Sequence, residues 1–203
     1  MENSDPKISV ITPSIRPDGL MMVQRCLQEQ TLQDFEWLTE IGFENKSDLN
    51  AALNRMIKRA KGELLVFYQD FIFVEKDCLQ NFWNEYQKNK KGFFTGCLNG
   101  DWRKDAVGKK LQFTDWEIDL GACPKEAMFK IGGFDEALDE FWGFDNVNVG
   151  LRAEMAGYEI LAVANKGGSA GHPEAPMKKN RNPKFHNQRL DEMRRGLKID
   201  YLT

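Results

Sequence analysis

One acidic residue, Asp145, stands where a carboxylate can do chemistry. It follows aromatic residues and a glycine, 141–144, and comes just before a predicted helix. Aromatic side chains can wall a cleft, and a carboxylate in such a cleft can remove a proton from a bound hydroxyl group. The same pattern is also typical of a turn with core aromatics and an acid at a helix N-terminus. Both interpretations are open at this point.

The first half of the chain predicts a parallel sheet. Two amphipathic helices are expected, one from Asp18 to about 30–31 and one between Ser47 and Gly62. Strands and helices that alternate with short connections favour right-handed crossovers, with the helices on the faces of the sheet. Short apolar runs predict the three strands at 8–11, 35–41 and 63–68.

The carboxyl ends of these three strands carry candidate ligand-binding residues. They are the loop 13–18, the segment around Glu40, and the pair Gln69 and Asp70. Ligands of parallel sheets bind beyond the carboxyl ends of the strands. We therefore expect all three segments to lie on one rim.

The second half continues the α/β pattern, and we expect a single domain over 1–203. From Lys166 the chain is predicted to be a loop that leads to an amphipathic helix with Leu190, Met193 and Leu197 on one face. The predicted elements before it are a helix around 79–86, a strand at 93–98, a mobile loop at 99–110, a half-exposed strand at 113–119, and helices at 125–131 and about 147–156, followed by a strand at 158–164.

Composition indicates a globular protein without a membrane span. Of 203 residues, 41% are apolar and 29% charged, and no long apolar run occurs. The polar segment 1–7 resembles neither a secretory signal nor a transit peptide, so we expect a cytoplasmic protein. The four cysteines, Cys26, Cys78, Cys97 and Cys123, have no Cys-x-x-Cys spacing, which predicts free, mostly buried thiols and argues against structural zinc.

The charge is small overall but unevenly distributed. A formal charge of −3 gives no general attraction to nucleic acid. The segment 178–198, however, carries eight basic residues against Asp191 and Glu192. This basic tail can meet phosphates.

Several short motifs follow one another in an order that resembles a known family. Their succession over about 7–165 resembles the family-2 glycosyltransferases of the GT-A fold, which transfer a sugar from a nucleotide sugar. The resemblance implies one Rossmann-like α/β domain with a mixed, mainly parallel sheet, helices on both faces and a helical C-terminal tail. Its parts would be a nucleotide-binding half at about 7–98, an acceptor half at 99–165, and a C-terminal loop and helix at 166–203. The motifs are Ile8–Ser14, Gln30–Thr31, Asn54–Arg55, Ala60–Leu64, Phe67–Asp70, Gly132–Glu136, Trp142–Asn146, Leu151–Arg152 and Gly157–Tyr158.

The resemblance implies a donor site on the rim. Backbone groups and a carboxylate there can bind a nucleoside by hydrogen bonds. Glu40 can equally be a solvated acid at a strand end. The residues assigned to the donor are Pro13, Ser14, Arg16, Glu40, Asn54, Gln69 and Asp70.

A divalent metal is implied, although the metal motif is degenerate. Where the family has Asp-x-Asp, this chain has Gln69, Asp70 and Phe71. Mn²⁺ or Mg²⁺ prefers oxygen ligands and can retain several waters, so Asp70 and a loop histidine, His172, are the predicted ligands. The basic residues Lys178, Lys179, Arg181 and Lys184 are an alternative that would compensate the diphosphate directly.

The sequence Trp142, Gly143, Phe144, Asp145 and Asn146 resembles the acceptor motif of the family. That motif usually ends in two acids, Glu-Asp or Asp-Asp, and the second is often the base; here Asp145 holds the first place and Asn146 the second. It implies that Asp145 is the catalytic base of an inverting displacement, while Trp142, Gly143, Phe144 and Asn146 form the acceptor site. If the base must stand at Asn146, the protein is impaired or inactive. Asp135 and Glu136 are alternative acids.

Three hypotheses follow for the function. The first is an inverting glycosyltransferase with a UDP-sugar donor and an unidentified acceptor, which can be a glycan, a small metabolite or a polyanion bound by the basic tail. The second is an inactive nucleotide- or glycan-binding domain of the same fold. The third, a nucleotidyltransferase, lacks its usual glycine- and lysine-rich loop in 13–19.

Overall fold

The computed structural model describes residues 5–41, 48–140, 143–170 and 182–203. Its centre is a seven-stranded sheet with the strand order β2-β1-β3-β7-β5-β8-β6. These strands are β1 (Ile8–Ser14), β2 (Phe35–Ile41), β3 (Leu64–Tyr68), β5 (Gly92–Cys97), β6 (Lys110–Leu111), β7 (Leu120–Pro124) and β8 (Glu159–Ala164). The helices are α1 (Pro17–Gln28), α2 (Leu49–Arg59), α3 (Cys78–Lys88), α4 (Lys125–Lys130), α5 (Asp145–Met155) and α6 (Pro183–Arg194), with 3-10 turns η1 (Trp102–Ala106), η2 (Phe113–Asp115) and η3 (Glu136–Leu138).

The parallel core predicted from the first half of the sequence is confirmed. Strand β1 is fully buried and pairs in parallel with β2 on one side and β3 on the other. Strand β8 pairs in parallel with β5, so both halves of the chain contribute to one mainly parallel sheet. The expected α/β architecture is therefore present.

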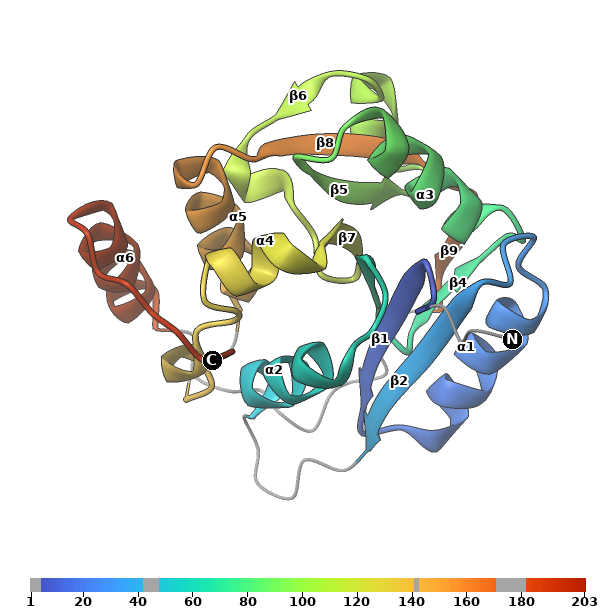
Figure 1. Cartoon of the computed structure of the whole chain (residues 1–203), viewed down its shortest axis with the longest axis horizontal. Coiled ribbons are helices and arrows are strands. Elements are labelled where there is room, and N and C mark those ends of the chain that lie inside the picture. Colours follow the sequence, from blue (N-terminus) through green and yellow to red (C-terminus); the bar gives the residue numbers. More distant parts are fainter. Residues whose placement is uncertain (1–4, 42–47, 141–142, 171–181) are drawn as a thin grey trace.

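Helices cover both faces of the sheet (Figure 1). On one face, α2, α4 and α5 enclose a core that includes Leu53, Met128 and Val149. On the other face, α1 and α3 enclose a second core that includes Val23 and Phe82. The apolar spacing of each helix accounts for this burial, because residues three or four apart share one helix face.

The prediction of a strand at 113–119 is wrong. The chain there makes the turn η2, which is held by a reciprocal pair of hydrogen bonds between Gln112 and Asp115. The strand begins later, as β7, and lies antiparallel between β3 and β5. Its residues include Gly121, Ala122 and Cys123, whose small side chains gave no strand pattern. The strand is formed because both of its edges pair with strands of the sheet, β3 along its whole length and β5 at Gly121 and Ala122.

Three further predictions need correction. The segment 99–110 was predicted as a loop but contains η1 and the start of β6. The segment after Lys166 forms β9 (Gly167–Ser169), which pairs with the unpredicted β4 (Ile72–Val74) as a small second sheet. Leu197 lies beyond the end of α6 and is 38% exposed, whereas Leu190 and Met193 pack against Leu151 of α5. Strands of three residues carry too little periodicity to be predicted from sequence.

The expectations about a membrane span and about the cysteines can also be compared with the structure. In the described ranges, no helix is both long enough and apolar enough to cross a bilayer. The four cysteines are free thiols, and all except Cys26 are buried. Burial raises the pKa of the Cys78 and Cys123 thiols, so these side chains are packing residues.

Candidate functional site

The donor side of the site is built where β1 and β3 end. Ser14, the last residue of β1, donates a 2.5 Å hydrogen bond from Oγ to Asp70 Oδ2. Arg16 donates from Nε to the same oxygen at 3.1 Å and from Nη2 to Asp70 Oδ1. The predicted residues Ser14, Arg16 and Asp70 therefore form one polar cluster on the predicted rim.

This cluster bears on the expected metal. Both oxygens of Asp70 already accept hydrogen bonds from Arg16, and the carboxylate is 5% exposed. The described residues contain no group of three or more His, Cys, Asp or Glu side chains that could hold an ion. Because these hydrogen bonds occupy the Asp70 oxygens, Asp70 is not arranged as a metal ligand in this structure. The other predicted ligand, His172, lies outside the described residues. The divalent metal stays a prediction.

Glu40 lies beside the cluster and is paired with arginine. Its strand position faces Pro13 in the β1–β2 register. Its Oε1 accepts a 2.9 Å hydrogen bond from Nε of Arg55, and Arg59 approaches Oε2 at 4.0 Å. Pro13 and Glu40 are thus together on the rim, as predicted.

Two other predicted donor residues have different surroundings. Asn54 is buried and holds the turn before η3, because its amide donates to Phe134 O at 2.9 Å and accepts from Phe134 N at 2.8 Å. Its visible role is structural. Gln69 is half-buried, and its backbone N–H donates to Asp119 O at 3.0 Å, which joins the end of β3 to the start of β7.

Asp145 is the first residue of α5 and is held by α2. Its Oδ1 accepts a 2.8 Å hydrogen bond from Nδ2 of Asn50. Burial raises the pKa of the Asp145 carboxyl to about 6, although the Asn50 amide lowers it. A carboxylate with this pKa is ionised at neutral pH and can still take up a proton, as a general base requires.

A second acid, Asp139, shares this amide. Its Oδ1 accepts 2.9 Å from Nδ2 of Asn50 and 2.7 Å from the Asn50 backbone N–H, and its Oδ2 accepts 3.0 Å from the Ala51 N–H. Asp139 therefore caps the N-terminus of α2 from a distant part of the chain. Burial raises its pKa to about 6, and the charge of Asp145 adds to this effect.

The backbone before Asp145 is unusual. Gly143 has φ +93°, and Phe144 has φ +70°, the one left-handed residue other than glycine in the described ranges. Such a conformation costs free energy and occurs at sites where the surroundings impose it. Here the Phe144 ring stacks on His186 of α6, with centroids 4.6 Å apart. The neighbouring Trp142 lies outside the described residues.

Asn146 connects the acceptor side to the segment before β7. Its Nδ2 donates to Trp116 O at 2.9 Å and to Glu117 Oε2 at 3.0 Å. Glu117 also accepts 3.1 Å from Arg103, and burial raises the pKa of its carboxyl. Asn146 is therefore a hydrogen-bond donor that holds the segment at Trp116 and Glu117 against the start of α5.

The alternative acids are committed to other contacts. Asp135 is buried and accepts two hydrogen bonds from Arg189, from Nε at 2.6 Å and from Nη2 at 3.1 Å. Glu136 accepts 2.9 Å from Asn54. These contacts hold the turn and α6 in place, so Asp145 is the better candidate for a base.

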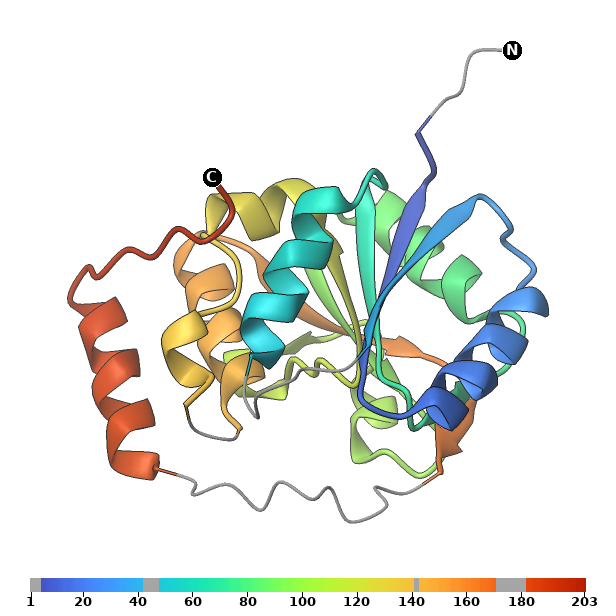
Figure 2. The ribbon, with the colours of Figure 1, turned by 90° about the horizontal axis from the view of Figure 1, so that it is seen from below.

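The two sides of the site share one edge of the sheet. In Figure 2 the starts of α2 and α5 lie at the same lower edge as the carboxyl ends of β1 and β2. Asp70 follows β3 at this edge, and the segment from Trp116 to Asp119 connects its neighbour Gln69 to Asn146 by hydrogen bonds. Asp70 and Asp145 are therefore on the rim and not in the apolar interior.

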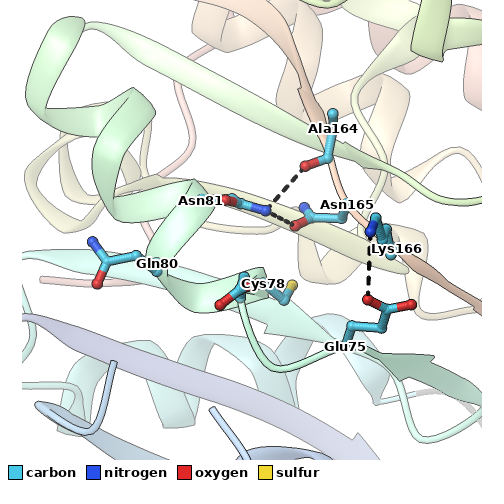
Figure 3. Close-up of a pocket in the computed structure, with 8 residues that line it drawn as sticks. Glu75, Cys78, Gln80, Asn81, Ala164, Asn165 and Lys166 are labelled. Atoms are coloured by element: carbon cyan, nitrogen blue, oxygen red, sulfur yellow. Dashed lines mark hydrogen bonds and ion pairs between the residues drawn. The ribbon is translucent and has the colours of Figure 1, made fainter. Parts of the chain in front are cut away.

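A separate small pocket of about 300 Å³ lies at the start of α3 and contains none of the predicted residues (Figure 3). Asn81 donates to Ala164 O at 3.2 Å and to Asn165 Oδ1 at 3.1 Å, and Lys166 pairs with Glu75 at 3.9 Å.

Comparison with known proteins identifies the fold. No protein-family profile and no curated protein matches the chain. Among solved structures, that of S. aureus TarS is similar with a TM-score of 0.62 and 14% identity over 92% of this chain. Residues 1–349 of TarS in complex with UDP-GlcNAc are similar with a TM-score of 0.61, 13% identity and the same coverage. The chain spans 42% of the first structure and 71% of the second, and the comparison confirms the expected GT-A fold.

Proposed function

We propose that this chain is a glycosyltransferase that transfers a sugar from a nucleotide-sugar donor, UDP-linked by default, to a hydroxyl group of an acceptor. The observation that carries the proposal is Asp145, a carboxylate at a helix start with a pKa of about 6, on the same sheet edge as the cluster of Ser14, Arg16 and Asp70. Similarity to the structure of TarS residues 1–349 in complex with UDP-GlcNAc supports the choice of donor.

In the proposed mechanism Asp145 removes the proton of the acceptor hydroxyl. The hydroxyl oxygen forms a bond to the anomeric carbon while the bond from that carbon to the diphosphate oxygen breaks. The electron pair of the broken bond leaves with the nucleoside diphosphate on the opposite side, so the configuration inverts. The rim residues Pro13, Ser14, Arg16 and Glu40 would bind the nucleotide, and Gly143, Phe144 and Asn146 the acceptor.

The two other hypotheses have less support. An inactive binding domain was suggested by Gln69, Phe71 and Asn146, but an intact carboxylate stands one residue before Asn146, with a pKa raised by burial to about 6. A nucleotidyltransferase would need a phosphate-binding loop after β1, whereas α1 begins at Pro17, three residues after β1 ends.

The function is tested by incubating the full chain with a panel of UDP-, GDP- and dTDP-sugars and measuring release of the nucleoside diphosphate. We expect slow hydrolysis of at least one UDP-sugar, because water can replace the acceptor. Parallel reactions with Mn²⁺ and with EDTA test the predicted metal, on which no step above depends. Binding of a donor without any turnover would contradict the proposal and favour the inactive domain.

Replacement of Arg16 should weaken donor binding. Arg16 is the half-buried cation of the rim cluster, and hydrogen bonds to a charged group are worth about 1.5–3 kcal/mol. We expect Arg16→Ala to raise the Kd for UDP by about 10- to 100-fold, measured by calorimetry. Arg25→Ala, at an exposed position of the adjoining helix α1, is the control and should bind UDP like the wild type. Equal affinity of both variants would remove Arg16 from the donor site.

A further inference from the structure

The residue between the two acids is Asn50, at the start of α2. It is 1% exposed, and its Nδ2 lies 2.8 Å from Asp145 Oδ1 and 2.9 Å from Asp139 Oδ1. An amide NH₂ carries two hydrogens, so each carboxylate receives one. The opposite orientation of the amide would direct its oxygen at two carboxylates. The two acids therefore determine the orientation of the Asn50 amide, and the amide in turn holds the two carboxylates in place.

The backbone at Asn50 is held in place by hydrogen bonds that do not involve the Asn50 side chain. The backbone N–H groups of Asn50 and Ala51 both donate to Asp139, at 2.7 and 3.0 Å. The side chain therefore projects from a helix start whose position is set by Asp139. This arrangement differs from an ordinary cap, because the capping acid also orients the amide that contacts Asp145.

We propose that Asn50 is a positioning residue, which holds the Asp145 carboxylate in place for proton removal and keeps it ionised near neutral pH, with Asp139 as the anchor of Asn50. The inference rests on the proposed function, since it assigns Asn50 a role toward the base of that reaction. A buried carboxylate without its hydrogen-bond donor takes up a proton more readily. Loss of the amide would therefore leave less of the base ionised.

Other charges surround the pair, and apart from Asp139 none of them has a hydrogen bond to the Asn50 amide among the described contacts. The elements packed around Asp145 carry many titratable and charged side chains. They include Asp48 before α2, Arg55, Lys58 and Arg59 on α2, Asp135, Glu136, Asp139 and Glu140 on the turn, Asp115 on η2, Glu117 beside Asn146, Arg152 and Glu154 on α5, and His186 and Arg189 on α6. A shift between wild type and variant therefore reports the loss of both amide contacts, the one to Asp145 and the one to its neighbour Asp139.

The test is the pH profile of donor hydrolysis for wild type, Asn50→Ala and Asn50→Ser. We expect the acid limb of kcat, near pH 6 in the wild type, to move up by about one pH unit in Asn50→Ala and by less in Asn50→Ser, which retains one donor. Asn84→Ala, at an exposed position of α3, is the matched control and should keep the wild-type limb. If kcat of the Asn50 variants is lowered by the same factor at every pH, and the acid limb stays where it is in the wild type, Asn50 has only a structural role and the inference is overturned.

A second readout does not need turnover. Carbon-13 NMR titration of the aspartate carboxyl groups, with the Asp145 signal assigned from Asp145→Asn, measures the pKa directly in the folded variants. We expect a higher Asp145 pKa in Asn50→Ala than in the wild type, and an unchanged value would overturn the inference. Absence of hydrolysis in the wild type would instead contradict the proposed function, while the titration would still test Asn50.

Discussion

Asp145→Asn is expected to lower kcat for donor hydrolysis and transfer by about 10²- to 10⁴-fold, the range that a positioned general base contributes. Asparagine is nearly the same size and can keep the hydrogen bond to Asn50 through its side-chain oxygen. The loss would therefore reflect the missing base. The Kd for UDP should stay within about twofold, because the donor cluster of Ser14, Arg16 and Asp70 does not contact Asp145. A variant with wild-type kcat would exclude Asp145 as the base.

The same substitution has an opposite expected effect on stability. The pKa of Asp145 is about 6 in the fold and about 3.9 in an unfolded chain, so folding favours the protonated form. The ionised carboxylate therefore costs stability above pH 6, and this cost disappears as the pH falls toward 4. Asp145→Asn should melt at a higher temperature than the wild type at pH 8, with a smaller difference at pH 4. Asp191→Asn, at an exposed position of α6, is the control and should show no such dependence.

The fold could be predicted where local pattern and tertiary structure agree. Strands β1 and β3 are buried on both faces, so they appear in the sequence as continuous apolar runs. Strand β7 is equally buried, yet Gly121 has to be small for close packing, since a Cβ there would lie 2.2 Å from Glu117 O. Small residues that are required by packing look like a loop, which explains why this central strand was missed.

The site could be predicted only in part for a related reason. Asp145 has a local signal, because it combines an aromatic segment with a helix start. Asn50 and Asp139 have none, since they meet across 89 positions of the chain and only the docking of η3 onto α2 brings them together. Glu117 was missed because it lies in a segment that was predicted as a strand. A carboxylate near the middle of that strand gave no reason to expect contact with Asn146.

Arg189→Ala should strongly destabilise the protein. Asp135 has a side chain with 0% exposure and depends on the Arg189 guanidinium, which donates to both of its oxygens. Removal of one partner of a buried pair costs about 3–5 kcal/mol, because an uncompensated charge stays buried. The buried Arg152, whose charge also acts on Asp135, will offset part of this, so we expect about 2–3 kcal/mol in denaturant unfolding.

A double substitution separates the buried charge from the packing of α6. If the cost comes from the unpaired Asp135, adding Asp135→Asn to Arg189→Ala should restore part of the stability lost. Arg194→Ala on the same helix removes an exposed pair with Asp191 at 3.0 Å and should change stability by less than about 0.5 kcal/mol. Helix α6 also carries His186, which stacks on Phe144 beside Asp145. Loosening of α6 should therefore lower kcat as well, and an Arg189→Ala variant with full activity and full stability would contradict this account of the ion pair.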